Sequence, residues 1–254
     1  MSNNVSDILK QLDSLNESTC VTVFVPSLKK NVRFKNLNLK QQKELLKSSI
    51  DDNITKLAFT TKFYDIIKEN AIDPIDINNL YIFDRTAIAL VLRANGLDTF
   101  YNVDDLKINL QDLITQNQNI DTETYVKPSV FELENLTVTL EVPKLFTDRI
   151  INNATINKLR GTSDKDVKTL IGELFVYEII KFVYSITFKN EDGSVATTVL
   201  ADLSIDDRVT VVEKLPSTII NKILSFIREY RAIENRFVTI DNTIIDVDSN
   251  FFSV

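Results

Sequence analysis

The side chains in this chain that could do acid–base chemistry are carboxylates, and several of them lie close together in the sequence. Three pairs of adjacent aspartates and one Glu-x-Glu spacing occur, at Asp51-Asp52, Asp104-Asp105, Asp206-Asp207, and Glu132 with Glu134. General acid–base catalysis needs two carboxyl groups that converge in one cleft. Adjacent residues on a helix do not share a face, and each aspartate pair falls at an expected cap or turn. The spacing therefore favours a structural role over a catalytic one.

A second group of charged residues lies on an apolar segment. The stretch from Phe83 to Leu97 is nearly all apolar and carries Asp84, Arg85 and Arg93. Because the two arginines are eight residues apart, about two helical turns, they lie on roughly one side of a helix. One interpretation is an ion-paired rim on a buried helix, and the other is a partner-binding surface. Charges that pair within the fold would make the helix a scaffold, and charges that face outward would make it an interface.

The composition removes most other catalytic chemistry. The chain has no histidine, the commonest general base and transition-metal ligand. Its single cysteine, Cys20, excludes an intramolecular disulfide and a thiolate zinc site, and it is consistent with a reducing compartment. The acidic string from Asp202 to Asp207 lacks the glycine and the bidentate glutamate of a calcium-binding EF-hand loop. We therefore expect a non-enzymatic protein with no cofactor and no metal.

Charge and length restrict the partners and the domain count. With a net charge of −7, the chain is unsuited to broad binding of nucleic-acid backbones, which needs clustered Lys and Arg. Residues 1–19 lack the apolar core of a signal peptide, and no apolar run is long enough to span a bilayer. We expect neither a nucleic-acid nor a membrane partner. A chain of 254 residues forms one large domain or two small ones.

The N-terminal part reads as an arm, a hairpin and helices. Apolar residues at helical spacing in residues 5–15 predict an amphipathic arm, which either packs on its own domain or frays, or else binds a partner. Alternation in residues 21–25 and 32–37 predicts a β-hairpin. Asn38 then caps a helix whose apolar side should hold Leu39, Leu45, Leu46 and Ile50. Its other side carries Lys40, Lys43 and Lys47, either as a solvated face or as a surface for an acidic partner.

The middle of the chain should contain two more helices and a polar connection. The periodicity predicts helices over residues 55–70 and from Leu80 to about Asn95, the second apolar nearly all round and therefore buried. Residues 102–112 alternate weakly, as a short strand or a helical turn. Residues 111–128 are rich in Gln, Asn, Asp and Thr and predict an exposed connection.

The C-terminal part mixes strands and helices. A period-2 pattern that changes phase at Glu134-Asn135 predicts a turn or bulge. Helices are expected over residues 145–159, from 165 to about 187 after a cap at Ser163 or Asp164, after a cap at Ser204, and from Ser217 to about Ala232. A hairpin turn is expected over residues 190–194. The tail ends in Phe251-Phe252, either an exposed partner anchor or packed into the tail's own sheet. The anchor reading predicts that loss of residues 250–254 weakens complex formation more than it lowers the melting temperature.

Together these patterns predict an α+β fold, mostly helical, with two or more small antiparallel β-hairpin or sheet elements. The expected domains are an arm over residues 1–19, a hairpin-plus-helices domain over 20–110, the polar connection over 111–128, and a β/helical domain over 129–254. The alternative is that residues 129–254 pack with 20–110 as a single unit.

Four stretches, in order, resemble a family of baseplate hub subunits and hub-assembly proteins from T4-type contractile-tailed bacteriophages. These are the strand and helix from Val32 to Leu46, the segment from Leu80 to Ala94, the strand from Leu136 to Pro143, and the stretch from Leu203 to Ile227. The resemblance covers most of the chain from about residue 20 onward. Its motifs are patterns of apolar and charged residues. Some family members carry cysteine pairs that suggest zinc, whereas this chain has only Cys20.

The resemblance implies a phage morphogenesis protein, either a structural subunit of the tail baseplate hub or a chaperone that assembles it. Its partners would be other hub and tail proteins, and it could form an oligomer within the baseplate. It would work in the host cytoplasm during assembly and, as a subunit, in the tail of the virion. The alternative is a generic intracellular adaptor or regulatory binding domain. The expected partner-binding residues are Lys40, Lys43, Lys47, Asp84, Arg85, Arg93, Phe251 and Phe252.

Overall fold

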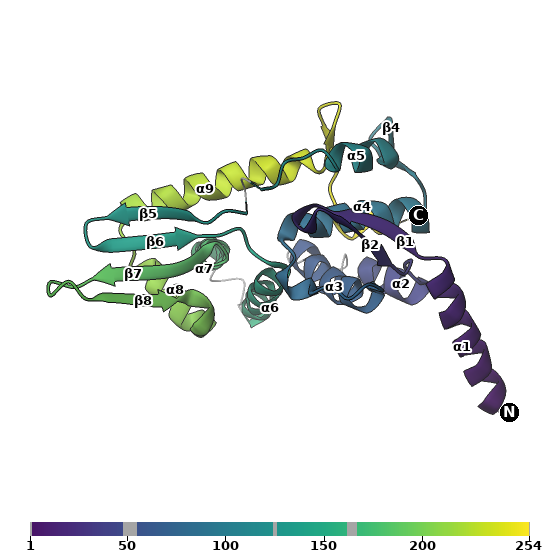
Figure 1. The fold of residues 1–254 in the computed structure, drawn as a ribbon, viewed down its shortest axis with the longest axis horizontal. Helices are drawn as coiled ribbons and strands as arrows, with labels where there is room; N and C mark the ends of the chain where they lie inside the picture. The colour runs from purple at the N-terminus through teal and green to yellow at the C-terminus, as the bar shows by residue number, and fades with distance from the viewer. Residues whose placement is uncertain (1, 48–54, 124–125, 162–166, 254) are drawn as a thin grey trace. The chain divides into compact units, whose positions relative to one another are not determined.

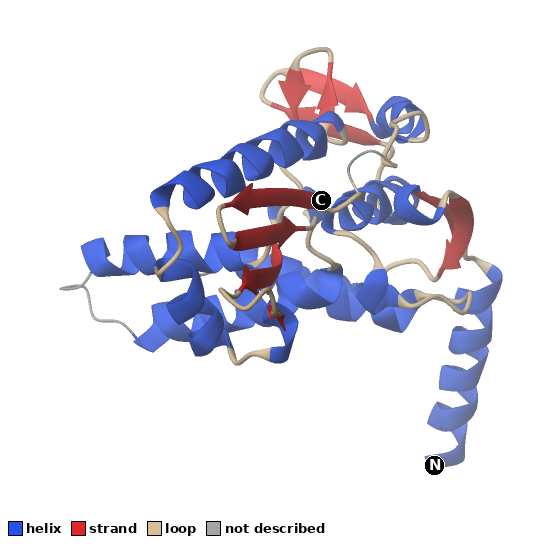
Figure 2. Ribbon diagram, turned by 60° about the vertical axis from the view of Figure 1, so that its left-hand side comes forward, coloured by secondary structure: helices blue, strands red, loops and turns tan. Residues whose placement is uncertain are grey.

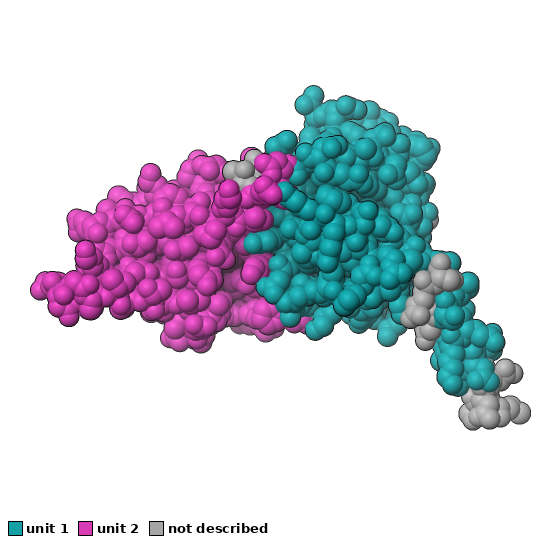
Figure 3. Space-filling view, viewed as in Figure 1, with its two compact units in different colours: residues 1–120, 236–254 teal, residues 121–235 magenta. Residues whose placement is uncertain are grey.

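The computed structural model describes residues 2–47, 55–123, 126–161 and 167–253, and it confirms an α+β fold in which helices predominate (Figures 1 and 2). The chain divides into two compact units (Figure 3). Unit 1 comprises residues 1–120 and 236–254, and unit 2 comprises residues 121–235. Residues 236–254, which were predicted to belong with 129–235, lie in unit 1, and so do residues 111–120 of the predicted connection.

Unit 1 is built from short hairpins on a helical core. Its helices are α1 (Ser2–Ser18), α2 (Leu39–Lys47), α3 (Thr55–Asn70), α4 (Ile82–Gly96) and α5 (Leu110–Asn117). Its strands pair as three antiparallel hairpins: β1 (Val21–Val25) with β2 (Lys30–Phe34), β3 (Phe100–Val103) with β4 (Leu106–Asn109), and β9 (Thr239–Ile240) with β10 (Thr243–Ile244).

The first hairpin forms as its alternation predicts. Val21, Val23 and Val25 are buried on one face of β1, and β1 packs against α4. A short 3-10 helix over Pro26–Leu28 joins the strands, and Lys29 closes the turn with a φ of 49°. In α2 the side chain of Asn38 accepts a hydrogen bond from the Gln41 backbone N–H at 2.9 Å, so the expected cap is confirmed.

Two expectations for unit 1 need correction. Leu39 was expected on the apolar side of α2 but is 64% exposed, while Leu45 is buried as predicted and Ile50 lies outside the described residues. The first part of the expected connection is the helix α5. This helix is mostly polar, but it buries Leu110 and Leu113. Its cap, Asn109, accepts a hydrogen bond from the Gln111 backbone N–H. Only Leu110, Leu113 and Asn117 of this helix are buried, so it leaves little apolar signal in the sequence.

Unit 2 packs helices on a four-stranded antiparallel sheet. The strands, β5 (Ser129–Leu133), β6 (Leu136–Leu140), β7 (Val183–Lys189) and β8 (Val195–Val199), pair in chain order. The helices are α6 (Leu145–Gly161), α7 (Val167–Ile180), α8 (Ile205–Glu213) and α9 (Ser217–Arg236). The predicted turn at Glu134-Asn135 is confirmed, with Glu134 at a φ of 52° and Leu133 opposite Leu136.

The helix expected to reach residue 187 is shorter in the structure. Helix α7 ends at Ile180, and the chain enters β7 at Val183. The sequence between them has neither Gly nor Pro, and continuous apolar residues suit a buried strand and a buried helix equally. The expected caps at Ser163 and Asp164 lie outside the described residues. The cap at Ser204 is confirmed, because its Oγ accepts a hydrogen bond from the Asp207 backbone N–H at 3.2 Å.

Candidate interaction surfaces

Asp84 lies in the first turn of α4 and is fully buried. Its Oδ2 accepts a hydrogen bond from the Tyr81 backbone N–H (2.8 Å), which caps the helix. Its Oδ1 accepts one from the Ser27 backbone N–H (2.9 Å), which ties the β1–β2 turn to α4. Burial raises the pKa of Asp84 to about 6, although both hydrogen bonds favour the ionised carboxylate. The structure therefore uses Asp84 as scaffold and removes it from any exposed partner surface.

Arg93, two turns further along α4, is also inside unit 1. Only 6% of the residue is exposed, and its guanidinium lies 4.8 Å from the centre of the Tyr101 ring and 5.3 Å from that of Phe251. Burial lowers the pKa of Arg93, and the two aromatic faces stabilise the cation. Arg93 is thus a packing residue rather than a partner contact. Arg85 is partly exposed, and its partner role stays a prediction.

The aromatic pair at the C-terminus is buried in the core of unit 1. Phe251 and Phe252 are 0% and 1% exposed, in a 3-10 helix over Asn250–Phe252. The Phe252 ring centre lies 6.0 Å from that of Phe59 and 5.4 Å from that of Phe63, both on α3. The exposed-anchor interpretation is therefore contradicted. The tail packs as expected within its own fold, but against helix α3 rather than a sheet of its own.

Helix α2 presents the predicted lysines to solvent. Lys40, Lys43 and Lys47 are exposed, and with Leu39 and Glu44 they line one surface hollow of about 410 Å³. Gln41, on the buried side of α2, donates from Nε2 to Asn70 Oδ1 at 2.8 Å. Glu44 lines the hollow with the lysines and bridges to Lys62 of α3 at 2.6 Å. We call the surface formed by Leu39, Lys40, Lys43 and Lys47 the basic face of α2. It combines three cations with a large exposed apolar side chain.

Helix α1 exposes every apolar side chain of its amphipathic stripe that the structure describes. Val5, Ile8, Leu9, Leu12 and Leu15 are 60%, 50%, 55%, 48% and 57% exposed. In Figure 1 the helix extends away from the strand that follows it. Packing of the arm on its own domain is therefore not what the structure shows, and its binding to a partner stays a prediction. We call these five residues the apolar stripe of α1.

Unit 2 contains two features that the sequence did not reveal. Lys181 is almost fully buried and bridges Asp148 and Glu178, each at 3.0 Å. Burial alone would lower the pKa of Lys181, but the attraction of the two carboxylates outweighs it and leaves the pKa raised. A lysine held as a cation is unsuited to nucleophilic chemistry. Asp148 and Glu178 are 33 and three positions from Lys181 in the sequence, so no local motif marks the cluster.

The second feature is a groove of about 430 Å³ beside the β5–β6 turn, near the junction of α8 and α9. Its walls are mainly apolar and include Leu136, Phe188, Leu215 and Pro216, with Lys214 and Glu134 at the same opening. Such a groove suits apolar side chains of another molecule and lacks the cluster of converging polar groups that a reaction needs.

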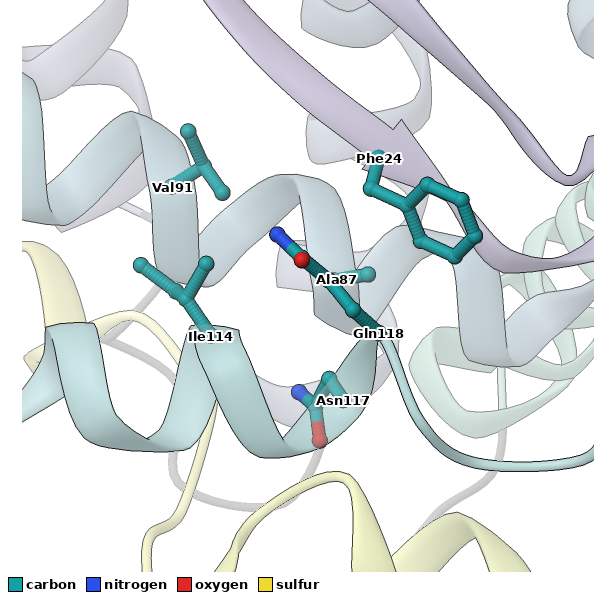
Figure 4. Close-up of a pocket in the computed structure, with 6 residues that line it drawn as sticks. All are labelled: Phe24, Ala87, Val91, Ile114, Asn117 and Gln118. Atoms are coloured by element: carbon teal, nitrogen blue, oxygen red, sulfur yellow. The ribbon is translucent and has the colours of Figure 1, made fainter.

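A third hollow, in unit 1, is too small for a ligand. Figure 4 shows the residues around it, which are Phe24, Ala87, Val91, Ile114, Asn117 and Gln118. Its volume of about 10 Å³ is close to the smallest that holds one water molecule. It is a packing defect between β1, α4 and α5.

Within the described ranges no group of three or more His, Cys, Asp or Glu side chains is placed to hold a metal ion. No helix in the described part of the chain has the length and apolarity needed to cross a lipid bilayer. Comparison of the chain with known protein families, curated proteins and solved structures found no match in any of the three.

Proposed function

We propose that this protein is a structural or assembly component of the baseplate hub of a contractile bacteriophage tail, and that it acts through protein–protein contacts. The observation that carries the proposal is the basic face of α2. The whole chain has a net charge of −7, yet Lys40, Lys43 and Lys47 converge on one exposed hollow beside Leu39. A local positive patch on an acidic protein attracts acidic partner surfaces and disfavours other contacts.

The resemblance to hub proteins supports the same surface. The first of its four stretches, from Val32 to Leu46, runs through β2 into α2 and ends on this face. The hydrogen bond from Gln41 to Asn70 and the bridge from Glu44 to Lys62 fix the orientation of α2 on α3. The lysines therefore start from a rigid base, which lowers the entropy lost on binding.

The partner that this face suits is an acidic surface of another hub or tail protein. Such a component would act in the host cytoplasm during assembly and would stay in the virion only as a hub subunit. An intracellular adaptor domain is the second candidate, because the basic face would serve it equally well. The identity of the captured proteins separates the two.

The test is affinity capture from phage-infected cells with the tagged full chain as bait. The test variant carries Lys40→Glu and Lys43→Glu. The matched control carries Lys189→Glu and Lys222→Glu, which makes the same charge change at two exposed positions of unit 2. We expect the wild type and the control to capture hub or tail proteins and the test variant to lose them. Capture of host regulatory proteins alone would favour the adaptor function. Capture of tail proteins by all three baits would show that the basic face of α2 is not part of the interface.

Mass spectrometry of purified phage particles then distinguishes the two roles within the proposal. A hub subunit is present in finished particles. An assembly chaperone is captured from infected cells but is missing from the particles.

A further inference from the structure

The apolar stripe of α1 forms a regular seam. Val5, Ile8, Leu12 and Leu15 are separated by three, four and three residues, the a and d spacing of a heptad repeat. Leu9 falls at an adjoining e position and widens the stripe. All five side chains are about half exposed or more in the structure. Soluble proteins seldom leave a continuous apolar face of this kind in water, so a partner surface is the physical expectation.

The charged residues of α1 lie away from this seam. Asp7 takes a c position and Lys10 an f position, both on the outer side of a helix pair. In the sequence of residues 2–18, no e or g position carries Asp, Glu, Lys or Arg. Charged e and g residues are what select a different partner helix or repel an identical one. Their absence from the sequence leaves a second copy of α1 free to pair despite the net charge of the chain.

A membrane surface fits the same stripe poorly. Helices that lie in a membrane interface carry Lys and Arg on the polar face, which attract anionic lipid headgroups. The sequence of residues 2–18 carries one lysine, Lys10, and three acidic residues, Asp7, Asp13 and Glu17. Its charge would not favour anionic lipid.

We propose that α1 is a self-association helix, and that the apolar stripe of one copy packs on the stripe of a second copy of this chain as a two-heptad coiled coil. A helix of this length is only marginally stable without tertiary contacts, so pairing also stabilises the helix. Two heptads bury a small area, and the association is therefore concentration-dependent rather than permanent. The proposal does not rest on the baseplate function, because it concerns only the purified chain.

Sedimentation equilibrium of the purified full chain, over about a hundredfold range of concentration, tests the proposal. The test variant Leu12→Glu places a charge at an a position in the seam. The matched control Ser14→Glu adds the same charge at an exposed c position outside it. We expect the wild type and Ser14→Glu to move from monomer to oligomer as concentration rises. We expect Leu12→Glu to weaken the association by at least about a hundredfold.

Two checks keep the result interpretable. Because Leu12 is 48% exposed, the thermal unfolding midpoint of dilute Leu12→Glu should match that of the wild type, which excludes misfolding as the cause. Helical circular dichroism should rise with concentration in the wild type and not in Leu12→Glu. A wild type that stays monomeric at the highest concentration would overturn the proposal, and so would equal association of Leu12→Glu. Loss of a captured tail protein with Leu12→Glu, from a monomeric wild type, would assign the stripe to a different partner.

Discussion

Asp84 makes the stability of unit 1 depend on pH. Its folded pKa of about 6 stands above the ~3.9 of an aspartate in an unfolded chain. The stability associated with the protonated carboxyl is therefore fully present below about pH 4 and is lost as pH rises through 6, by roughly 3 kcal/mol. Because Asp84→Asn does not titrate, we expect its unfolding free energy relative to wild type to rise by about that amount from pH 4 to pH 7. Urea unfolding at a series of pH values measures the difference.

The asparagine also loses one of the two acceptors that face Ser27 and Tyr81. That loss lowers the unfolding free energy of Asp84→Asn by about 1–3 kcal/mol at every pH. It therefore does not change how the difference from wild type depends on pH. Asp105→Asn removes a charge at an exposed position of the same unit and serves as the control. If the unfolding free energy of Asp84→Asn relative to wild type falls as pH rises, the hydrogen bonds to the carboxylate outweigh the cost of burying it.

Lys181 is a buried charged residue of unit 2. The attraction of its two carboxylate partners outweighs the effect of burial on its pKa. Its side chain is 9% exposed and bridges Asp148 and Glu178. We expect Lys181→Met to lower the unfolding free energy by about 3–5 kcal/mol, because it removes the buried cation that Asp148 and Glu178 share. Chemical unfolding of the full chain checks this value.

Arg231→Met is the matched control for Lys181→Met. Arg231 also bridges Glu178, at 3.0 Å, but its side chain is 58% exposed. A bridge so open to water contributes at most about 1 kcal/mol. Equal effects of the two substitutions would mean that the Lys181 cluster is no more important than a surface ion pair.

At the scale of elements, the C-terminal segment is a core element. Phe252→Ala removes a ring that packs against Phe59 and Phe63, and we expect it to destabilise unit 1 by about 3–5 kcal/mol. Loss of residues 250–254 should likewise lower the melting temperature, the reverse of what an exposed anchor predicts. Phe146→Ala is the control, since Phe146 is 44% exposed and should cost about 1 kcal/mol or less. An unchanged melting temperature for Phe252→Ala would show that the tail is not part of the core of unit 1.

The elements that could be predicted from the sequence are those with a strong local signal. The alternation in β1 and β6, the periodicity of α3, and the cap at Ser204 each depend on residues within one element. The exposure of Lys40, Lys43 and Lys47 was also predictable, because a charged helical face is usually solvated. The short helix α5 was missed because few of its residues point inward.

The burial of the candidate site residues depended on contacts that no local pattern contains. Phe252 packs against Phe59 and Phe63, which lie 193 and 189 positions earlier in the chain. Arg93 is covered by Tyr101 and Phe251. Asp84 receives a hydrogen bond from Ser27, which is 57 residues away. A lone charge on an apolar helix has the same appearance in sequence whether a neighbouring segment covers it or a partner does.

At the scale of the whole molecule, unit 1 is discontinuous and unit 2 is continuous. Unit 1 takes Phe237, Phe251 and Phe252 from the second of its two segments, and all three are fully buried. The segments meet where Asn117 donates from Nδ2 to the Phe237 carbonyl at 2.9 Å and Gln116 donates to the Arg236 carbonyl at 3.2 Å. Residues 120 and 236 are therefore close enough for a short linker.

This division predicts which fragments fold. We expect residues 121–235 alone to give cooperative thermal unfolding and native-like near-ultraviolet circular dichroism, because their core is self-contained. Residues 1–120 alone should not, because three of their core rings are missing. Residues 1–120 joined to 236–254 by a Gly/Ser linker should regain cooperative unfolding. Cooperative unfolding of residues 1–120 alone would show that the second segment is dispensable.

The discontinuity of unit 1 also sets an order of events on the ribosome. Domains usually fold from the N-terminus onward as they leave the exit tunnel, at about 5–20 residues per second. Here the first segment of unit 1 emerges before all of unit 2, yet it lacks Phe251 and Phe252 until those residues have been made. Unit 1 therefore cannot complete its core before the last residues of the chain are made. The rings of Phe59 and Phe63, which are translated early, wait for Phe252 through almost the whole of synthesis.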